Sequence, residues 1–359
     1  MKEQLAVVIM AGGAGTRFWP ISTEECPKQF LTLFDKRSLL QQSYDRVSSL
    51  VPPERIFVLT NSTFVDLVKE QLPNVPETNI IGEPIRRDTA AAVALSALLC
   101  EQRLGPSVIA VLTADHHIQP TSRFQQVLLS AAKGALNNTD ALYTFGTNPT
   151  YPATCYGYLH LGAQIHVDGD IPHFQLLDFK EKPDEKTAQE YFGSQNYRWN
   201  SGMFVWTTTA ILNELRLQLP DHLRHLEKAV EQDGTPQWET AIETAFSSLQ
   251  PVSIDYGVME HAAKVNAVVA DYAWNDVGGW LALENFLEKD SKSNAFRGNL
   301  HTLNARNNLC FCENTDEHIA LVGVEGMVVV RAGNKTLVVK RDCVEQVKQL
   351  VQSLERSLR

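Results

Sequence analysis

The sequence lacks an excess of positive charge, since 42 Asp and Glu residues outnumber 32 Lys and Arg residues and leave a formal net charge of -10 over 359 residues. A surface that neutralises nucleic-acid phosphates needs a concentrated excess of Lys and Arg. The balance therefore argues against a nucleic-acid partner. It remains compatible with a few local cations around a small anionic substrate.

Long hydrophobic runs are also missing from the chain. The N-terminal apolar run, residues 5–10, stops at a pair of glycines, whereas a membrane-spanning helix needs about 20 apolar residues. Glu3 precedes that run without the basic segment of a secretory signal peptide. We therefore expect no membrane partner and a cytoplasmic location. With a hydrophobic fraction of 44% the chain can bury a large core, and its 359 residues suggest one large domain plus a small one, or two domains.

Cysteines are few and scattered. Six occur in the chain, and the closest two, Cys310 and Cys312, lack the second pair of ligands that a structural zinc site requires. On a strand these two thiols would point to the same face. We therefore interpret them as reduced packing residues of a cytosolic protein.

Two common nucleotide-binding loops are absent as well. The apolar strand Leu5 to Met10 continues into Ala11-Gly12-Gly13-Ala14-Gly15-Thr16-Arg17. A Walker A loop would end in Gly-Lys-Ser/Thr, and the dinucleotide fingerprint would have a third glycine where Phe18 stands. The segment is therefore not a P-loop, and a nicotinamide or flavin cofactor is disfavoured.

What the segment does contain is a cluster of glycines with two cations nearby, Arg17 and Lys28. Glycines let backbone N–H groups approach an anion closely, and the two side chains add the full charges that neutral amides lack. The combination indicates a phosphate cradle. A glycine-rich turn between strand and helix, with no ligand, is the alternative.

The first part of the chain alternates short apolar strands with helical patterns, which predicts an α/β fold with a parallel sheet wrapped by helices. In such sheets ligands bind outside the carboxyl ends of the strands. The predicted strands are residues 5–10, 56–60, 108–113 and 141–146, and the predicted helices are residues 38–50, 64–72, 89–104 and 124–136.

After about residue 285 the pattern changes to short β-rich runs separated by glycine and asparagine turns. We therefore expect two domains, a catalytic domain over residues 1–285 and a small β-rich domain over residues 286–359. The second would close with a helix that begins with a capping box, Asp342 and Glu345. The apolar stripe of that helix is interpreted as packing and comprises Val344, Val347, Val351 and Leu354.

Two aspartates follow apolar runs. Asp115 comes directly after residues 108–113, and Asp276 lies shortly beyond residues 267–270. Magnesium at nucleotide sites is held by one or two carboxylates, with phosphates and waters completing the octahedron. The pair is a candidate magnesium site. Turn or helix-capping aspartates are the alternative for each residue alone.

Three further polar segments stand in apolar or glycine-containing surroundings. Residues 83–89 precede an apolar helix, for which Asp88 or Thr89 would be the N-cap. Glu181 can accept hydrogen bonds from sugar hydroxyls, and Lys182 is a point charge suited to a phosphate. Asn200 offers an amide beside a strand. Taken singly, each such segment is more often a surface ion pair or a turn than a ligand site.

The ordered set of motifs resembles the nucleotidyltransferases that make sugar nucleotides, in particular those that act on GTP and mannose 1-phosphate. The resemblance spans essentially the whole chain, and its specificity comes from the order of the motifs. They are Pro27 to Phe30, Ala114 to His116, Tyr156 to Tyr158, Glu181 to Pro183, Asn200 to Phe204, Ser253 to Glu260 and Asp276 to Trp280.

The resemblance implies a Rossmann-like fold of the glycosyltransferase A type, a mixed and mostly parallel sheet flanked by helices, with a C-terminal β-helix-like domain. It implies a single activity, in which GTP and mannose 1-phosphate give GDP-mannose and pyrophosphate with Mg2+ as cofactor. It also leaves open a homodimer. The alternatives are the same chemistry with another sugar 1-phosphate or NTP, or a non-catalytic regulatory subunit that binds sugar nucleotides.

Residue roles carry over by position. Arg17 and Lys28 would be catalytic, stabilising charge on the triphosphate and the leaving pyrophosphate, and Asp115 and Asp276 would bind the metal. Nucleotide-binding residues would be Ala11, Gly12, Gly13, Gly15, Thr16, Glu83, Arg87, Asp88 and Thr89. Mannose 1-phosphate would be held by Gly157, Glu181, Lys182 and Asn200.

Overall fold

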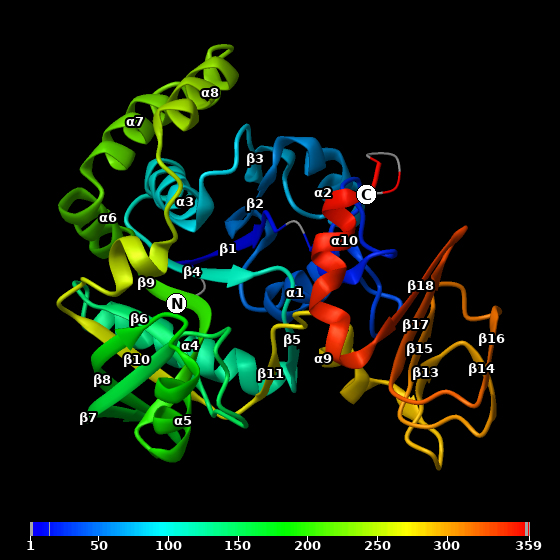
Figure 1. Cartoon of the computed structure of the whole chain (residues 1–359). Helices are drawn as coiled ribbons and strands as arrows, with labels where there is room; N and C mark the ends of the chain where they lie inside the picture. Colours follow the sequence, from blue (N-terminus) through cyan, green and yellow to red (C-terminus); the bar gives the residue numbers. More distant parts are fainter. Residues whose placement is uncertain (1–2, 14, 356–357, 359) are drawn as a thin grey trace. The chain divides into compact units, whose positions relative to one another are not determined.

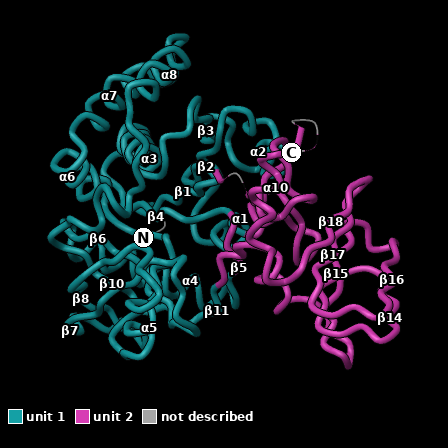
Figure 2. The backbone as a smooth tube through the Cα atoms, viewed as in Figure 1, with its two compact units in different colours: residues 1–12, 43–114, 118–274 teal, residues 13–42, 115–117, 275–359 magenta. Residues whose placement is uncertain are grey.

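The computed structural model describes residues 3–13, 15–355 and 358, which form two compact units. The first unit comprises residues 1–12, 43–114 and 118–274, and the second comprises residues 13–42, 115–117 and 275–359 (Figure 2). The units are therefore not contiguous in sequence. Most of the glycine loop and the segment around Asp276 group with the C-terminal residues, so contacts do not divide the chain simply at residue 286.

The first unit is built on a nine-stranded sheet with the strand order β3-β2-β1-β4-β9-β6-β10-β8-β7 (Figure 1). Strands β8 and β9 run opposite to the other seven, which confirms a mixed, mostly parallel sheet. The four predicted strands are confirmed to within one residue at each end. The strands are β1 (Leu5–Ala11), β2 (Ile56–Asn61), β3 (Ile80–Glu83), β4 (Val108–Thr113), β6 (Leu142–Thr147), β7 (Tyr158–Asp168), β8 (Ile171–Lys180), β9 (Tyr197–Thr207) and β10 (Val265–Ala270).

Helices cover this sheet because its central strands are apolar on both faces. In β1, Ala6 and Val8 lie in one core cluster with α3, while Val7 and Ile9 point to the other face and are equally buried. Helix α4 packs on β4, β6, β9 and β10. The helices are α1 (Leu39–Val47), α2 (Val65–Gln71), α3 (Asp88–Leu104), α4 (Thr121–Asn137), α5 (Glu185–Gly193), α6 (Thr208–Gln218), α7 (Pro220–Val230) and α8 (Trp238–Ser248).

Two helix predictions need correction. The helix predicted over residues 38–50 ends at Val47, after which the backbone N–H of Leu50 bonds to the Val47 carbonyl in a tighter turn. Helix α3 begins at Asp88 with Arg87 at its N-cap position and no side-chain cap, so the N-cap prediction was wrong. In the described part of the chain, no helix is long and apolar enough to cross a membrane.

Within the second unit, residues 288–340 are β-rich, as predicted for the C-terminal part of the chain. Successive strands alternate between two sheets. Strands β13, β15 and β17 pair in parallel in one sheet, and β14 and β16 pair in parallel in the other. This alternation is the winding of a β-helix. Cys310 and Cys312 share one face of β15, while Leu309 and Phe311 face a different core cluster, confirming the packing interpretation. The strands are β12 (Glu288–Lys289), β13 (Ala295–Arg297), β14 (Asn299–Leu303), β15 (Leu309–Cys312), β16 (His318–Val322), β17 (Met327–Ala332) and β18 (Lys335–Lys340).

The chain closes with a 3-10 helix, η8 (Arg341–Gln346), followed by α10 (Val347–Ser353). The predicted capping box is wrong, because the N-cap of η8 is Lys340 and it makes no side-chain cap bond. The apolar stripe is confirmed as packing: Val344, Val347 and Val351 are buried together with Phe18 and Trp280. Helix α9 (Trp280–Leu283) supplies that tryptophan, and short strands β5 (His117–Gln119) and β11 (Ala273–Asn275) form a two-stranded sheet.

Candidate functional site

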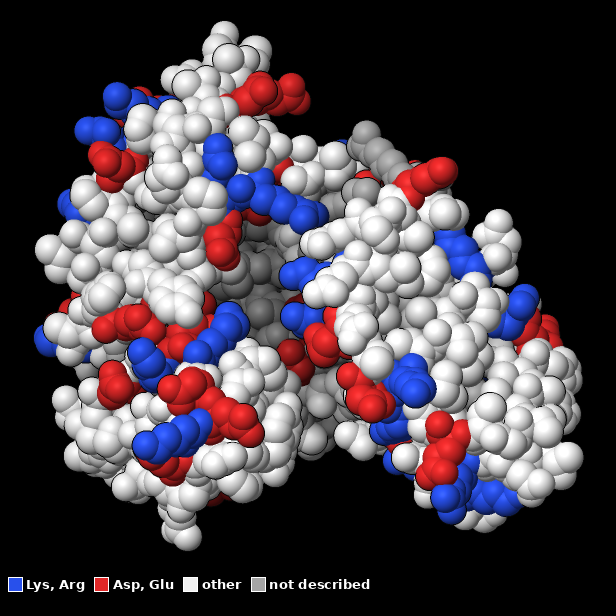
Figure 3. Space-filling model, in the orientation of Figure 1, with Lys and Arg blue, Asp and Glu red and all other residues white. Residues whose placement is uncertain are grey.

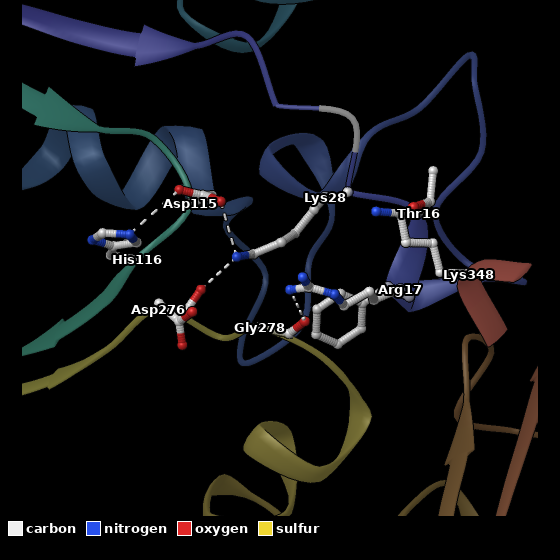
Figure 4. A pocket seen from close by; sticks show the side chains of 10 residues that line it. Thr16, Arg17, Lys28, Asp115, His116, Asp276, Gly278 and Lys348 are labelled. Atoms are coloured by element: carbon white, nitrogen blue, oxygen red, sulfur yellow. Dashed lines mark hydrogen bonds and ion pairs between the residues drawn. The ribbon is translucent and has the colours of Figure 1, made fainter. Parts of the chain in front are cut away.

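A polar cavity of about 330 Å3 lies within the second unit (Figure 4). On the face seen in Figure 3, Lys and Arg are interspersed with Asp and Glu. An anion site on such a surface depends on which charged side chains lie next to one another and not on the net charge of the chain. The cavity gathers residues from separate stretches of the chain. It is lined by Gly15, Thr16, Arg17, Phe18, Lys28, Asp115, His116, Asp276, Gly278 and Lys348.

Gly15 is required by the close approach of the loop to Lys28. Its φ of +59° lies in the left-handed region, and a Cβ at this position would stand 2.4 Å from the Lys28 Cβ and 2.5 Å from the Lys28 backbone nitrogen. The hydroxyl of Ser22 donates to the Gly15 carbonyl at 2.7 Å and fixes the turn. Gly13 is exposed beside Gln29, whose amide donates to the Gly13 carbonyl. Ala14 lies outside the described residues.

Lys28 joins the two candidate metal ligands. Its ammonium donates to Asp115 Oδ2 at 2.9 Å and to the backbone carbonyl of Asp276, and the residue is only 6% exposed. Burial would raise the pKa of the Asp115 carboxyl, but the charges of Lys28 and His116 outweigh it and hold that pKa below its usual value. Asp115 is thus a carboxylate at neutral pH.

Arg17 lines the same cavity and lies beside Gly278 (Figure 4). Its guanidinium donates to the Gly278 carbonyl at 3.2 Å and lies 3.7 Å from Glu345 Oε2. The Arg17 side chain is half exposed, whereas its neighbour Phe18 is fully buried against Trp280, with ring centroids 5.1 Å apart. The buried ring anchors the loop and leaves the charged head accessible.

The donor set fits magnesium. Asp115 and Asp276 line one cavity and offer the hard oxygen donors that Mg2+ prefers. Within residues 3–13, 15–355 and 358, no group of three or more His, Cys, Asp or Glu side chains is arranged to hold a metal by itself.

The predicted sugar-phosphate residues come together in the first unit, where the start of β7, the end of β8 and the first residues of β9 lie side by side. The backbone N–H of Asn200 donates to the Gly157 carbonyl at 2.8 Å. A Cβ on Gly157 would stand 2.4 Å from Glu181 Oε2, so only glycine leaves room for that carboxylate. Lys182, with a left-handed φ of +44°, pairs with Glu181 at 2.8 Å.

Sequence reasoning missed two further carboxylates of this group, Asp255 and Glu260. Asn200 Nδ2 donates to Asp255 Oδ1 at 3.0 Å, and the backbone N–H of Glu181 donates to Glu260 Oε1 at 3.2 Å. Burial, reinforced by the charge of Glu181, raises the pKa of Asp255 to about 7. The signal was present in the motif Ser253 to Glu260, where two acids stand among apolar residues.

Asn200 is held in one orientation. Its Oδ1 accepts from the Thr144 hydroxyl at 2.9 Å and from the backbone N–H of Gly202, while its Nδ2 faces Asp255. This pattern fixes which end of the amide is the donor. Burial acts to lower the pKa of Lys182, but Glu181 and Asp255 outweigh it and hold that pKa above its usual value, so the ammonium stays charged.

The segment over residues 83–89 divides into two parts. Glu83 is the last residue of β3 and is 8% exposed. Its side chain approaches Gly12, the residue that follows the end of β1 at Ala11, and a Cβ on Gly12 would lie 3.5 Å from Glu83 Oε2. Burial raises the pKa of Glu83 to about 8, and among the described residues its Oε1 has no hydrogen-bond partner.

The later residues of the segment are tied to the last turn of α8 and to the stretch that follows it. Arg87 Nε donates to the Phe246 carbonyl at 2.7 Å, and the Thr89 hydroxyl accepts from the backbone N–H of Ile254 at 2.8 Å. Asp88 has a left-handed φ of +64°, and its carboxylate accepts from the Thr89 backbone N–H. These contacts connect the segment to the motif that carries Asp255.

Comparison with known proteins identifies the family. Residues 6–293 match the family described as Nucleotidyl transferase, and residues 302–354 match the MannoseP isomerase/GMP-like beta-helix domain. The chain is 38% identical to mannose-1-phosphate guanylyltransferase RfbM of Salmonella typhimurium, over 98% of this chain and 72% of that protein. It is 37% identical to the xanthan biosynthesis protein XanB of Xanthomonas campestris pv. campestris, over 97% of this chain and 73% of that one.

Two solved structures have the same overall fold as this chain or most of it. A Thermus thermophilus protein described as mannose-1-phosphate geranyltransferase is 32% identical and superposes with a TM-score of 0.86, covering 98% of this chain and 99% of that one. A Helicobacter pylori protein described as mannose-6-phosphate isomerase is 25% identical with a TM-score of 0.60, covering 75% of this chain and 99% of that one. By family match, relatives and fold, the chain belongs to the nucleotidyltransferase family, among the mannose-1-phosphate guanylyltransferases.

Proposed function

We propose that this protein transfers the guanylyl group of GTP to mannose 1-phosphate, giving GDP-mannose and pyrophosphate, with Mg2+ as cofactor. The observation that carries the proposal is the cavity of the second unit, where Arg17 and Lys28 meet two carboxylates, Asp115 and Asp276. Cations suit the polyphosphate, and the carboxylates suit the metal that accompanies it.

The reaction is an in-line attack by a phosphate oxygen of the sugar phosphate on the α-phosphorus of GTP. A bond forms to that oxygen, the bond to the β-phosphate oxygen breaks, and pyrophosphate leaves with the electron pair. The attacking phosphate is already ionised at neutral pH, so the chain needs neither a covalent nucleophile nor a general base. Its tasks are to align two anions and to stabilise the developing charge.

Lys28 and Arg17 perform the second task. The ammonium of Lys28 is buried and held by Asp115, so its charge is already in place before substrate binds. Arg17 has a half-exposed guanidinium able to meet phosphate oxygens. Backbone N–H groups of the cradle would come from Ala11, Gly12, Gly13, Gly15 and Thr16, where the glycines allow close approach.

Asp115 and Asp276 would hold Mg2+ together with oxygens of the nucleotide. When bound, the ion neutralises phosphate charge and lowers repulsion between the two substrates. Lys28 bonds to the Asp115 side chain and to the Asp276 backbone carbonyl, and both aspartates line the same cavity.

The first unit would hold the sugar phosphate and the base. Glu181 and Asn200 provide acceptors and a donor for sugar hydroxyls, and Lys182 provides the cation for the phosphate. Glu83, with one oxygen lacking a partner among the described residues, is suited to hydrogen-bond the guanine base. Arg87 and Thr89 would shape the nucleotide side through their contacts with residues 246–254, and Asp88 through its bond to the Thr89 backbone.

We further propose a cytoplasmic enzyme whose partners are its two substrates and a second copy of itself, with residues 1–285 as the catalytic domain and 286–359 as the small β-rich domain. The short apolar runs support the location, and the β-helix winding supports the second domain. Light scattering behind size exclusion would measure the mass of the assembly.

The decisive experiment measures pyrophosphate release across a panel of NTPs and sugar 1-phosphates, with and without Mg2+. GTP with mannose 1-phosphate should give the highest kcat/KM, and only with the metal. Faster release by another pair would assign a different substrate. No release by any pair, with sugar nucleotide still bound, would indicate a regulatory subunit.

A further inference from the structure

The C-terminal helix brings a third cation to the cavity of the second unit. Lys348 lines that cavity together with Arg17 and Lys28, although more than 300 residues separate it from them. Figure 4 shows its side chain extending from the C-terminal helix toward Thr16. Neither the motifs of the sequence nor the reaction described above assigns this lysine a role.

The position of Lys348 is fixed by packing. Its neighbour Val347 and the residue one turn later, Val351, are 2% and 5% exposed and belong to the core cluster that contains Phe18. Helix α10 also contacts the 3-10 helix η1 (Thr16–Phe18), which carries Arg17. The helix is therefore held against the phosphate-binding loop, and the Lys348 backbone cannot drift away from it while that core is intact.

The charges around this part of the cavity are incompletely paired. Glu345, also from the C-terminal segment, lies 3.7 Å from Arg17, but both side chains are largely in water, at 50% and 83% exposure, and such a pair is weak. In the part of the chain that the structure describes, no hydrogen bond or ion pair engages the ammonium of Lys348. Cations that converge on one cavity repel each other until an anion binds between them.

We propose that Lys348 binds the terminal phosphates of the nucleoside triphosphate and the leaving pyrophosphate, and that Glu345 is a counter-ion that holds Arg17 until those phosphates replace it. The inference rests on the proposed function and extends it to the C-terminal segment. It assigns that segment a part in substrate binding as well as packing.

The two residues should then act in opposite directions. Lys348→Gln removes a charge-assisted contact and should weaken binding of GTP and pyrophosphate by about tenfold. Glu345→Gln removes a competitor for Arg17 and should strengthen both by roughly two- to fivefold. Neither change should alter binding of GMP or mannose 1-phosphate, because neither ligand has β- and γ-phosphates.

The experiment is titration calorimetry of the full-length protein with pyrophosphate, GTP and GMP in the presence of Mg2+. Lys340→Gln is the matched control, since this exposed lysine of the same unit removes the same charge away from the cavity. Thermal melting checks that each variant is folded. Opposite shifts for Lys348→Gln and Glu345→Gln, with no shift for Lys340→Gln, are the expected result.

Equal effects of Lys348→Gln and Lys340→Gln on pyrophosphate binding would overturn the assignment and leave Lys348 as a solvent-exposed side chain. A matching loss of GMP affinity would overturn it too, since the effect would then not reside at the terminal phosphates. If the wild-type protein bound neither GTP nor pyrophosphate, the proposed function itself would fail, so the two failures are distinguishable.

Discussion

Replacing Gly15 by alanine tests the geometry of the phosphate loop directly. Two costs arise from the structure. An L-residue at φ +59° costs about 1–2 kcal/mol, and a Cβ placed 2.4 Å and 2.5 Å from Lys28 atoms forces a displacement that costs about 1–3 kcal/mol. Because one of those atoms is a backbone nitrogen, side-chain rotation cannot relieve the contact.

The matched control is Gly323→Ala. Gly323 belongs to the same unit and has a similar φ of +67°, but a Cβ there meets nothing within 4 Å. Its variant carries only the conformational cost of about 1–2 kcal/mol. The difference between the two variants therefore isolates the contact with Lys28.

Both variants would be measured by calorimetric melting and by pyrophosphate release. At roughly 2 °C per kcal/mol, Gly323→Ala should lower the Tm by a few degrees and Gly15→Ala by about twice that. Moving Lys28 also breaks its bonds to Asp115 and Asp276, so Gly15→Ala should lose at least about tenfold in kcat, while Gly323→Ala keeps its rate. Equal Tm and equal rate for the two variants would refute the reasoning.

Three further predictions concern other parts of the chain. Asp115→Asn and Asp276→Asn should each reduce kcat severely and raise the Mg2+ concentration needed for half-maximal rate; folded variants with normal rates would rule out the metal ligands. Gly157→Ala should push the Glu181 carboxylate out of place and raise the KM for mannose 1-phosphate at least fivefold with little change in the KM for GTP, and the reverse pattern would contradict the sugar-site assignment. Burial lowers the pKa of His173 to about 4, so as the pH falls the unfolded chain binds a proton at this residue before the folded chain does. The free energy of unfolding should therefore fall by about 3 kcal/mol between pH 6.5 and 4 through this residue. Urea melts of His173→Asn should show a smaller fall with pH, and the same fall as in the wild-type protein would refute the assignment.

The elements of about the first 150 residues were largely predictable from the sequence, whereas no strands or helices were predicted for β7 to β10 or α5 to α8. The strand over residues 108–113 was predicted residue for residue, because a run of β-branched and aliphatic side chains between polar segments favours one conformation locally. That the two cysteines of β15 share one face followed from the alternation of side chains along a strand. Helix ends were less predictable: both capping predictions, at residues 88–89 and at Asp342, were wrong, since caps depend on which partner the folded chain supplies.

The site residues also divide into those that local sequence predicts and those that only folding brings together. The elements, the glycine loop and the charged residues that follow the strands can be read from the amino-acid order, because they depend on neighbours within a few positions. That Asp255 and Glu260 join Asn200 and Glu181, and that Lys348 joins Arg17, emerges only once the chain is folded. These contacts span many tens to hundreds of residues, and packing of buried side chains such as Phe18 and Val347, not local preference, sets which distant charges meet.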